Sequence, residues 1–169
     1  MQGVSRFWQS GPQVFSLEAW VRTSTSTGGK IIGFGDRNTG RSGTNGNDRN
    51  LYMNNAGRIY FGVRPDMGTR VTINSPATYR DNQWHHVVAT LGSDGMKLYV
   101  DGNQVASNAN VKKAQVYRGY WRIGGDQLSS WPSVPSREAI TANLDEIAVY
   151  PSALSASRVS AHFLASGRT

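Results

Sequence analysis

Hydrophobic and polar residues alternate along most of the chain, in short stretches separated by turn-forming residues. The clearest stretch is residues 14–21, VFSLEAWV, in which Phe15, Leu17 and Ala19 fall on one face and Glu18 falls on the other. Side chains two residues apart share one face of a β-strand. The alternation therefore predicts a strand with one buried face.

Further strands are predicted wherever such a stretch is bounded by glycine, asparagine, aspartate or proline. They are residues 29–35, 50–63 (a hairpin turning at 54–57), 70–76, 84–91, 96–101, 101–107, 120–125 and 142–150. Only the tail predicts a helix, because Ser155 is placed to cap residues 156–167 between Leu154 and Gly167. Short, regularly interrupted strands with one terminal helix predict an all-β fold, an antiparallel two-sheet β-sandwich or jelly roll.

Length, cysteine content and charge narrow the class of protein. A chain of 169 residues suits one domain, 1–169, and the absence of cysteine excludes disulfides and thiolate metal sites. No apolar run approaches the roughly 20 residues that a membrane span needs. The net charge of +7 is dispersed, with one adjacent basic pair at Lys112–Lys113. It therefore predicts a solvated basic surface, with weak polyanion affinity as the alternative and no specific nucleic-acid partner.

The sequence WHH at 84–86 raises the question of a metal or catalytic site. Adjacent strand residues point to opposite faces, so His85 and His86 cannot hold one ion from the same side. The third histidine, His162, lies in the predicted helix, and no H-x-H or H-E-x-x-H spacing occurs. We interpret the pair as architectural, with one histidine packed or hydrogen-bonded within the sandwich and the other facing away.

Paired carboxylates are the other catalytic chemistry to consider. Glycoside hydrolysis needs two of them, roughly 5 to 10 Å apart. The chain has three glutamates, Glu18, Glu138 and Glu146, and the adjacent Asp145 and Glu146 face opposite ways in a strand. No G-x-S-x-G elbow is present either. The sequence predicts no enzyme activity, unless one glutamate faces another carboxylate across an open cleft.

Several stretches together resemble a known family. FSLEAWVRT, GGKIIGFGD, NNAGRIYFGV, NQWHHVVATLGSDGMKLYVDGNQVAS, WRIGGD and LDEIAVYPSALSASRVSAHF follow one another as in laminin-G-like jelly-roll domains, the bacterial branch of the concanavalin A-like lectin/glucanase fold. The resemblance runs from about Val14 to Phe163, and the E-x-D-x-E strand carried by glucanases of this fold is missing. Such domains usually begin with a strand that pairs near the final one. Here either the chain is trimmed at its N-terminus or GVSRFWQ, residues 3–9, supplies that edge.

The resemblance also implies a calcium site. Laminin-G domains often place a calcium-binding aspartate just after the strand that corresponds to residues 29–35, and Asp36 matches it. Calcium takes carboxylate, amide and carbonyl oxygens. The further ligands implied are the carbonyl of Met53 and one of Asn108, Asn110 and Asp126. The alternative is that Asp36 and Asp48 only cap turns through side-chain hydrogen bonds.

A long loop is the remaining candidate for ligand binding. Residues 119–138, GYWRIGGDQLSSWPSVPSRE, lose strand alternation after Gly125 and contain a tryptophan and two prolines. Proline-stiffened loops with an aromatic residue often bind ligands in sandwich lectins. Trp131 would stack on a sugar while Asp126 and Gln127 bond its hydroxyls. The alternative is that Trp131 folds back as a lid over the core.

The resemblance, rather than composition or spacing, implies the function. We expect a non-catalytic binding module that recognises glycan or a glycan-bearing surface, with calcium as the candidate cofactor. No signal peptide opens the chain, so an extracellular location would make it a fragment of a larger secreted protein. Two alternatives stay open: a protein-interaction or adhesion domain that uses the same loops, and a structural spacer within a secreted enzyme or adhesin.

Overall fold

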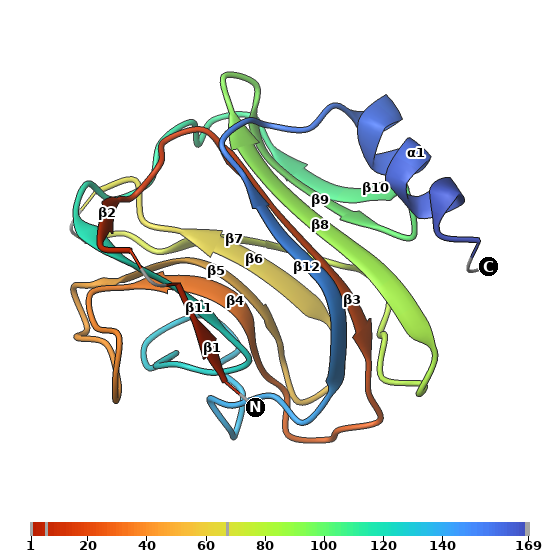
Figure 1. The fold of residues 1–169 in the computed structure, drawn as a ribbon, viewed down its shortest axis with the longest axis horizontal. Coiled ribbons are helices and arrows are strands. Elements are labelled where there is room, and N and C mark those ends of the chain that lie inside the picture. Colours follow the sequence, from red (N-terminus) through yellow and green to blue (C-terminus); the bar gives the residue numbers. More distant parts are fainter. Residues whose placement is uncertain (1, 6, 67, 168–169) are drawn as a thin grey trace.

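The structure, a computed structural model, describes residues 2–5, 7–66 and 68–167. Two antiparallel sheets pack face to face, and one short helix lies against the outside of the second sheet (Figure 1). This arrangement confirms the predicted two-sheet sandwich with a C-terminal helix. No helix in the described ranges is long and apolar enough to cross a membrane.

The first sheet has seven strands in the order β1-β11-β4-β5-β6-β7, with β2 also paired to β11. Its strands are β1 (Gly3–Val4), β2 (Gln9–Ser10), β4 (Gly29–Gly35), β5 (Asn47–Met53), β6 (Ile59–Val63), β7 (Val71–Asn74) and β11 (Arg118–Ile123). The second sheet has five strands in the order β10-β9-β8-β3-β12. Its strands are β3 (Phe15–Arg22), β8 (Trp84–Gly92), β9 (Gly95–Val100), β10 (Asn103–Asn108) and β12 (Asn143–Tyr150).

The core lies between the sheets and follows the alternation in the sequence. Phe15, Leu17 and Ala19 of β3 are fully buried there, and the ring of Phe15 meets Phe61 at 6.1 Å and Trp121 at 6.0 Å between centroids. The intervening residues of β3 therefore face outward. The two sides of the five-stranded sheet thus carry different chemistry, which sets the position of the site described below.

Helix α1 (Ala156–Ala165) packs on the outer face of the five-stranded sheet. The Ser155 hydroxyl accepts the backbone N–H of Arg158 at 3.2 Å, which satisfies one of the free donors of the first turn. Val159 is buried against the sheet, and Leu154 packs beside it, so the predicted cap and staple are both confirmed. The helix covers part of the face and leaves the rest open.

The N-terminal segment pairs with β11, and not beside the final strand. Gly3 lies opposite Ile123 and Gln9 lies opposite Gly119, both in the seven-stranded sheet. Of the two alternatives given above, the second is therefore not what the described residues show, since neither β1 nor β2 pairs with β12. Within the described ranges β12 pairs with β3 alone, and its register is interrupted by a bulge between Asp145 and Ala148.

Candidate functional site

The loop after β11 folds back over the outer face of the seven-stranded sheet. Trp131 is 3 % exposed and forms a closed cluster with Tyr52, Tyr60 and Leu128. The Tyr60 hydroxyl donates to the hydroxyl of Ser133 at 2.9 Å, which ties the loop to β6. Trp131 thus covers the outer face of the seven-stranded sheet as a lid. Its buried ring is not positioned to stack on a sugar. This corrects the expectation of a ligand-binding tryptophan.

Asp126 and Gln127, at the start of this loop, hold it against the seven-stranded sheet. The Asp126 carboxylate accepts the backbone N–H of Ser42 at 2.9 Å and lies 3.6 Å from the Lys30 ammonium, with both charged side chains fully buried. The backbone carbonyl of Gln127 accepts from the side-chain amide of Asn47, and the Gln127 side-chain amide donates to the hydroxyl of Ser129 at 2.6 Å. Buried and engaged in this way, the two side chains serve the fold, so the expected trio with Trp131 does not form an open site.

Burial shifts the pKa values of the two partners, Lys30 and Asp126, in opposite directions. It lowers the pKa of Lys30 to about 8, although the Asp126 charge opposes the shift. Burial alone would raise the pKa of Asp126, but Lys30 and the Ser42 N–H bring it below its ordinary value. The pair is therefore a structural charge contact under the loop.

The four residues expected to bind calcium are not brought together. Asp36 follows Gly35, which pairs with Asn47 at the start of β5, whereas Met53 ends β5 opposite Gly29. Six residues of strand, at about 3.3 Å each, separate those two ends. Asn108 and Asn110 belong to the edge of the other sheet, where the Asn108 side chain accepts the Asn110 N–H at 3.0 Å. This set is therefore wrong as one coordination sphere.

The turn-capping alternative describes Asp36, whereas Asp48 lies in β5 and is held by residues distant in the chain. Asp36 accepts the Gly43 N–H at 2.8 Å. Asp48 is fully buried and accepts three backbone N–H groups, those of Arg49, Arg64 and Gln115, at 2.7 to 2.8 Å. Its carboxylate also pairs with the Arg49 guanidinium at 3.1 Å. Its lone pairs are occupied by the protein itself.

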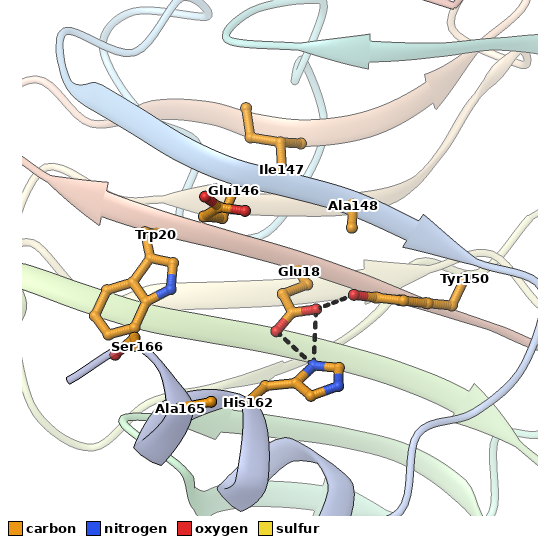
Figure 2. A pocket seen from close by; sticks show the side chains of 9 residues that line it. All are labelled: Glu18, Trp20, Glu146, Ile147, Ala148, Tyr150, His162, Ala165 and Ser166. Atoms are coloured by element: carbon orange, nitrogen blue, oxygen red, sulfur yellow. Dashed lines mark hydrogen bonds and ion pairs between the residues drawn. The ribbon is translucent and has the colours of Figure 1, made fainter. Parts of the chain in front are cut away.

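A polar network that the sequence did not reveal lies on the outer face of the five-stranded sheet (Figure 2). Glu18 of β3 stands at its centre, 5 % exposed. One carboxylate oxygen lies 2.6 Å from Nε2 of His86 and 3.0 Å from Nδ1 of His162, and the other accepts the Tyr150 hydroxyl at 2.5 Å. One acidic group thus joins β3, β8, β12 and α1.

The network keeps Glu18 ionised. Burial alone would raise its pKa, but the hydrogen bonds from His86, Tyr150 and His162 outweigh burial and lower the pKa to about 2. Nε2 of His86 lies 2.6 Å from the Glu18 carboxylate and therefore donates to it, whereas Nδ1 is buried without a partner among the described residues. The carboxylate is the fixed acceptor of the cluster.

The cluster is a set of hydrogen bonds and not a metal centre. Two ligands of one tetrahedral zinc ion, each about 2.1 Å from it, would stand about 3.4 Å apart. Nε2 of His86 and the nearer oxygen of Glu18 are closer, at 2.6 Å. Over residues 2–5, 7–66 and 68–167, no group of three His, Asp, Glu or Cys side chains is suited to an ion.

The network opens into a pocket of about 510 Å³, here called the Glu18 pocket. Its polar lining includes Glu146, whose backbone has the left-handed φ of 47° at the β12 bulge. Trp20, Ile147, Ala148 and Ala165 supply apolar lining (Figure 2). A strained backbone at a pocket rim is a frequent mark of a functional position.

Glu18 and Glu146 thus line one open pocket, which is the condition set above for reconsidering catalysis. A general acid must hold a proton near neutral pH. Glu18 has a pKa of about 2, and both of its oxygens are already engaged. Glu18 is therefore not placed to act as the general acid of a glutamate pair.

A second hollow of about 480 Å³, here called the Trp84 hollow, lies on the other side of Trp20. Its lining combines aromatic and acidic side chains: Trp20, Trp84, Phe163, His85, Asp81, Asp101 and Gln83. The Trp20 ring stacks on Phe163 at 6.0 Å and lies 5.1 Å from the ring of His86. Trp20 thus forms the wall between the two hollows.

The two histidines of WHH face different surroundings, as the strand alternation predicts. His86 bonds Glu18, while His85 lies 2.8 Å from Asp101 and 3.1 Å from Asp81. These carboxylates raise the pKa of His85 against the effect of burial. Both rings are hydrogen-bonded and structural, yet His85 also lines the Trp84 hollow.

The signal for the Glu18 network was present but incomplete in the sequence. Glu18 is the one acidic residue of its strand and lies on the outward face, and His86 is a polar residue of another strand. Their contact depends on β3 pairing with β8, where Trp20 lies opposite His86. That pairing joins segments far apart in the chain, so it could not be read from local pattern.

Comparison with known proteins supports the fold. The CBM40 domain of the Ruminococcus gnavus IT-sialidase, bound to α2,3 sialyllactose, superposes with a TM-score of 0.68 at 18% identity, covering 90% of this chain and 84% of that one. The SAP-like pentraxin of Limulus polyphemus also gives 0.68, at 20% identity, covering 94% and 73%.

Pappalysin-1 of Mus musculus is 31% identical over 106 residues, 56% of this chain and 6% of that protein. The chain thus spans a small part of this curated relative. Residues 7–160 match the family described as the concanavalin A-like lectin/glucanases superfamily, in its laminin-G branch. With this match over most of its length and a two-sheet sandwich to accompany it, the chain belongs to that family.

Proposed function

We propose that this domain is a non-catalytic binding module that holds carbohydrate on the outer face of its five-stranded sheet. The observation that carries the proposal is the Glu18 pocket, where the exposed carboxylate of Glu146 stands beside the fixed side chains of Tyr150 and His162. Sugars present both hydroxyls and apolar C–H surfaces. A concave lining of rigid polar groups with aromatic and aliphatic walls suits both.

The Trp84 hollow extends the same chemistry past the Trp20 wall. Half-buried Trp84 and Phe163 provide aromatic surface, and Asp81, Asp101 and Gln83 provide acceptors and an amide. Carboxylates accept hydrogen bonds from sugar hydroxyls and form stronger bonds than neutral acceptors do. The two hollows would take neighbouring units of one glycan.

The comparisons support this class of ligand without naming it. The CBM40 domain of the same fold is bound to sialyllactose, and the family is described by its lectins and glucanases. We propose no catalytic role for the domain because Glu18 is held ionised by three partners. An extracellular setting, where glycans are displayed, is part of the same proposal.

A glycan array followed by calorimetry on each hit tests the proposal. We expect Glu146→Gln to weaken binding roughly tenfold, the usual cost of a hydrogen bond to a charged group. Asp94→Asn is the matched control, because Asp94 is an exposed carboxylate in the β8–β9 turn. An array without hits, or equal affinity for Glu146→Gln and wild type, would contradict the proposal.

A further inference from the structure

A third cavity, on the seven-stranded side of the sandwich, is lined by three arginines. It encloses about 460 Å³ where the loop after β4 meets the segment after β11. Its charged and amide lining consists of Arg41, Arg122, Arg137, Asp126, Glu138 and Gln2. Neither hollow of the five-stranded sheet shares a residue with it. The cavity is therefore a separate surface feature.

Arg122 is a buried guanidinium held in one orientation. The side chain is 6 % exposed and donates to the carbonyl of Arg37 at 2.6 Å and to that of Gly40 at 2.8 Å. A guanidinium has five N–H donors in a planar fork, so these two bonds leave others for a ligand. Fixing the fork in advance removes the ordering cost that a flexible surface arginine pays on binding.

The two carboxylates of the cavity are already matched by cations. Asp126 pairs with fully buried Lys30 at 3.6 Å and more loosely with Arg122 at 4.0 Å, and Glu138 pairs with Arg41. The Arg137 side chain is exposed, and no described residue forms an ion pair with it. With Lys30 beneath, four cations stand against two carboxylates, which leaves an unbalanced positive charge around Arg122 and Arg137.

We infer that this cavity is a binding site for an oxyanion, a carboxylate or sulfate group, held between Arg122 and Arg137. Arginine forks match the paired oxygens of such groups in geometry and in charge. Arg41 would join them once the incoming anion displaces Glu138. The inference stands apart from the proposed carbohydrate site, because the two sites share no residue.

Glu138 makes the inference testable by a gain of binding. Its carboxylate occupies Arg41 and repels an anion, so Glu138→Gln should raise the affinity for an oxyanion by roughly tenfold. Arg137→Gln should lower the affinity by a similar factor, because it removes an unpaired guanidinium. A misfolded variant would not gain affinity, which separates a binding effect from a folding defect.

The experiment is a titration, followed by NMR, with inorganic sulfate, glucuronate, N-acetylneuraminate and neutral glucose at constant ionic strength. The Arg122 Nε–Hε signal and the Gly40 amide should shift with at least one anion and not with glucose. Preference for either sugar acid over sulfate would identify an acidic sugar as the source of the group. Preference for sulfate over both sugar acids would identify a free inorganic anion as the ligand.

Two control variants separate a built site from general electrostatics. Asp94→Asn removes another exposed carboxylate paired with a cation, Lys97, and Arg158→Gln removes an exposed arginine of α1. Neither should change the affinity. Equal effects of Glu138→Gln and Asp94→Asn, equal effects of Arg137→Gln and Arg158→Gln, or no shift with any anion would overturn the inference.

Discussion

His162 of α1 and Glu18 of β3 lie 144 positions apart in the chain, and their side chains meet at 3.0 Å. The contact fastens the C-terminal helix to the outer face of the sheet. The same carboxylate holds His86 and Tyr150, so the helix, an edge strand and two central strands share one acceptor. The stability of this face and the shape of the Glu18 pocket therefore depend on a single side chain.

Acid should release this contact in a defined pH range. The pKa of Glu18 is about 2 in the folded protein, against an ordinary 4.5. A depressed acid pKa means that the unfolded chain binds more protons, so the stabilisation is complete above about 4.5 and is lost as the pH falls to 2. We expect the free energy of unfolding of the wild type to fall by about 3 kcal/mol more than that of Glu18→Gln over this range. Urea unfolding at each pH measures it.

Glu146→Gln is the control for that experiment. Its carboxylate lines the same pocket but is exposed, so this variant should keep the wild-type dependence on pH. A pH dependence of Glu18→Gln identical to that of the wild type would show that Glu18 does not carry the acid sensitivity.

The buried pair of Lys30 and Asp126 predicts strong coupling between two substitutions. Lys30→Met leaves the buried Asp126 carboxylate without its nearer cation and with only Arg122 at 4.0 Å, and breaking a buried pair in this way typically costs about 3–5 kcal/mol. Adding Asp126→Asn removes the orphaned charge, so the double variant should recover most of that loss. Arg41→Met, which breaks the exposed pair with Glu138, should cost less than about 1 kcal/mol. Additive losses in the double variant would contradict this account.

Trp131 predicts a loss of stability without a loss of binding. Trp131→Ala removes a buried ring from the cluster with Tyr52 and Tyr60, at a cost of about 3–5 kcal/mol. Binding at the Glu18 pocket should be unchanged, because that pocket lies on the other sheet. Trp8→Ala, at a ring 48 % exposed, is the matched control and should cost much less. Loss of glycan binding in Trp131→Ala, with stability retained, would restore the ligand role first expected of it.

Calcium binding stays a prediction that thermal unfolding decides. Asp36 and Met53 stand at opposite ends of the β4–β5 pair, so this set should give no calcium-specific rise in Tm. A native-state ligand at 100 times its Kd would add about 2.7 kcal/mol, a shift of several degrees. Melting in calcium, in magnesium and in EDTA, for the wild type and Asp36→Ala, makes the comparison. A calcium-specific shift that Asp36→Ala retains would indicate a different set of ligands.

The strands could be predicted from the sequence because their pattern is local. Alternation at residues 14–21 marks the buried face of β3, and the cap at Ser155 marks the start of α1. The fate of the loop after β11 could not be predicted in the same way. Whether Trp131 faces solvent or the sheet depends on Tyr52 and Tyr60, which line the outer face of strands distant in the chain.

Pairing between distant segments also explains why the sequence predicted ligand-binding roles for residues that serve the fold. Asp126 and Gln127 have the side chains of a lectin loop, but the Asp126 carboxylate pairs with buried Lys30 and the Gln127 amide donates to Ser129. A lysine within the apolar run GKIIGFG was the available sign that a buried carboxylate would be needed nearby. Only the sheet order shows that the carboxylate is Asp126.

The bulge at Glu146 has a consequence for the protein in concentrated solution. The outer edge of β12 offers backbone N–H and carbonyl groups along eight residues, a length on which another chain could begin a fibril. The register break between Asp145 and Ala148 divides that edge into two short pieces and turns the local backbone out of line. A backbone distortion beside the pocket thereby also keeps neighbouring molecules from adding to the sheet.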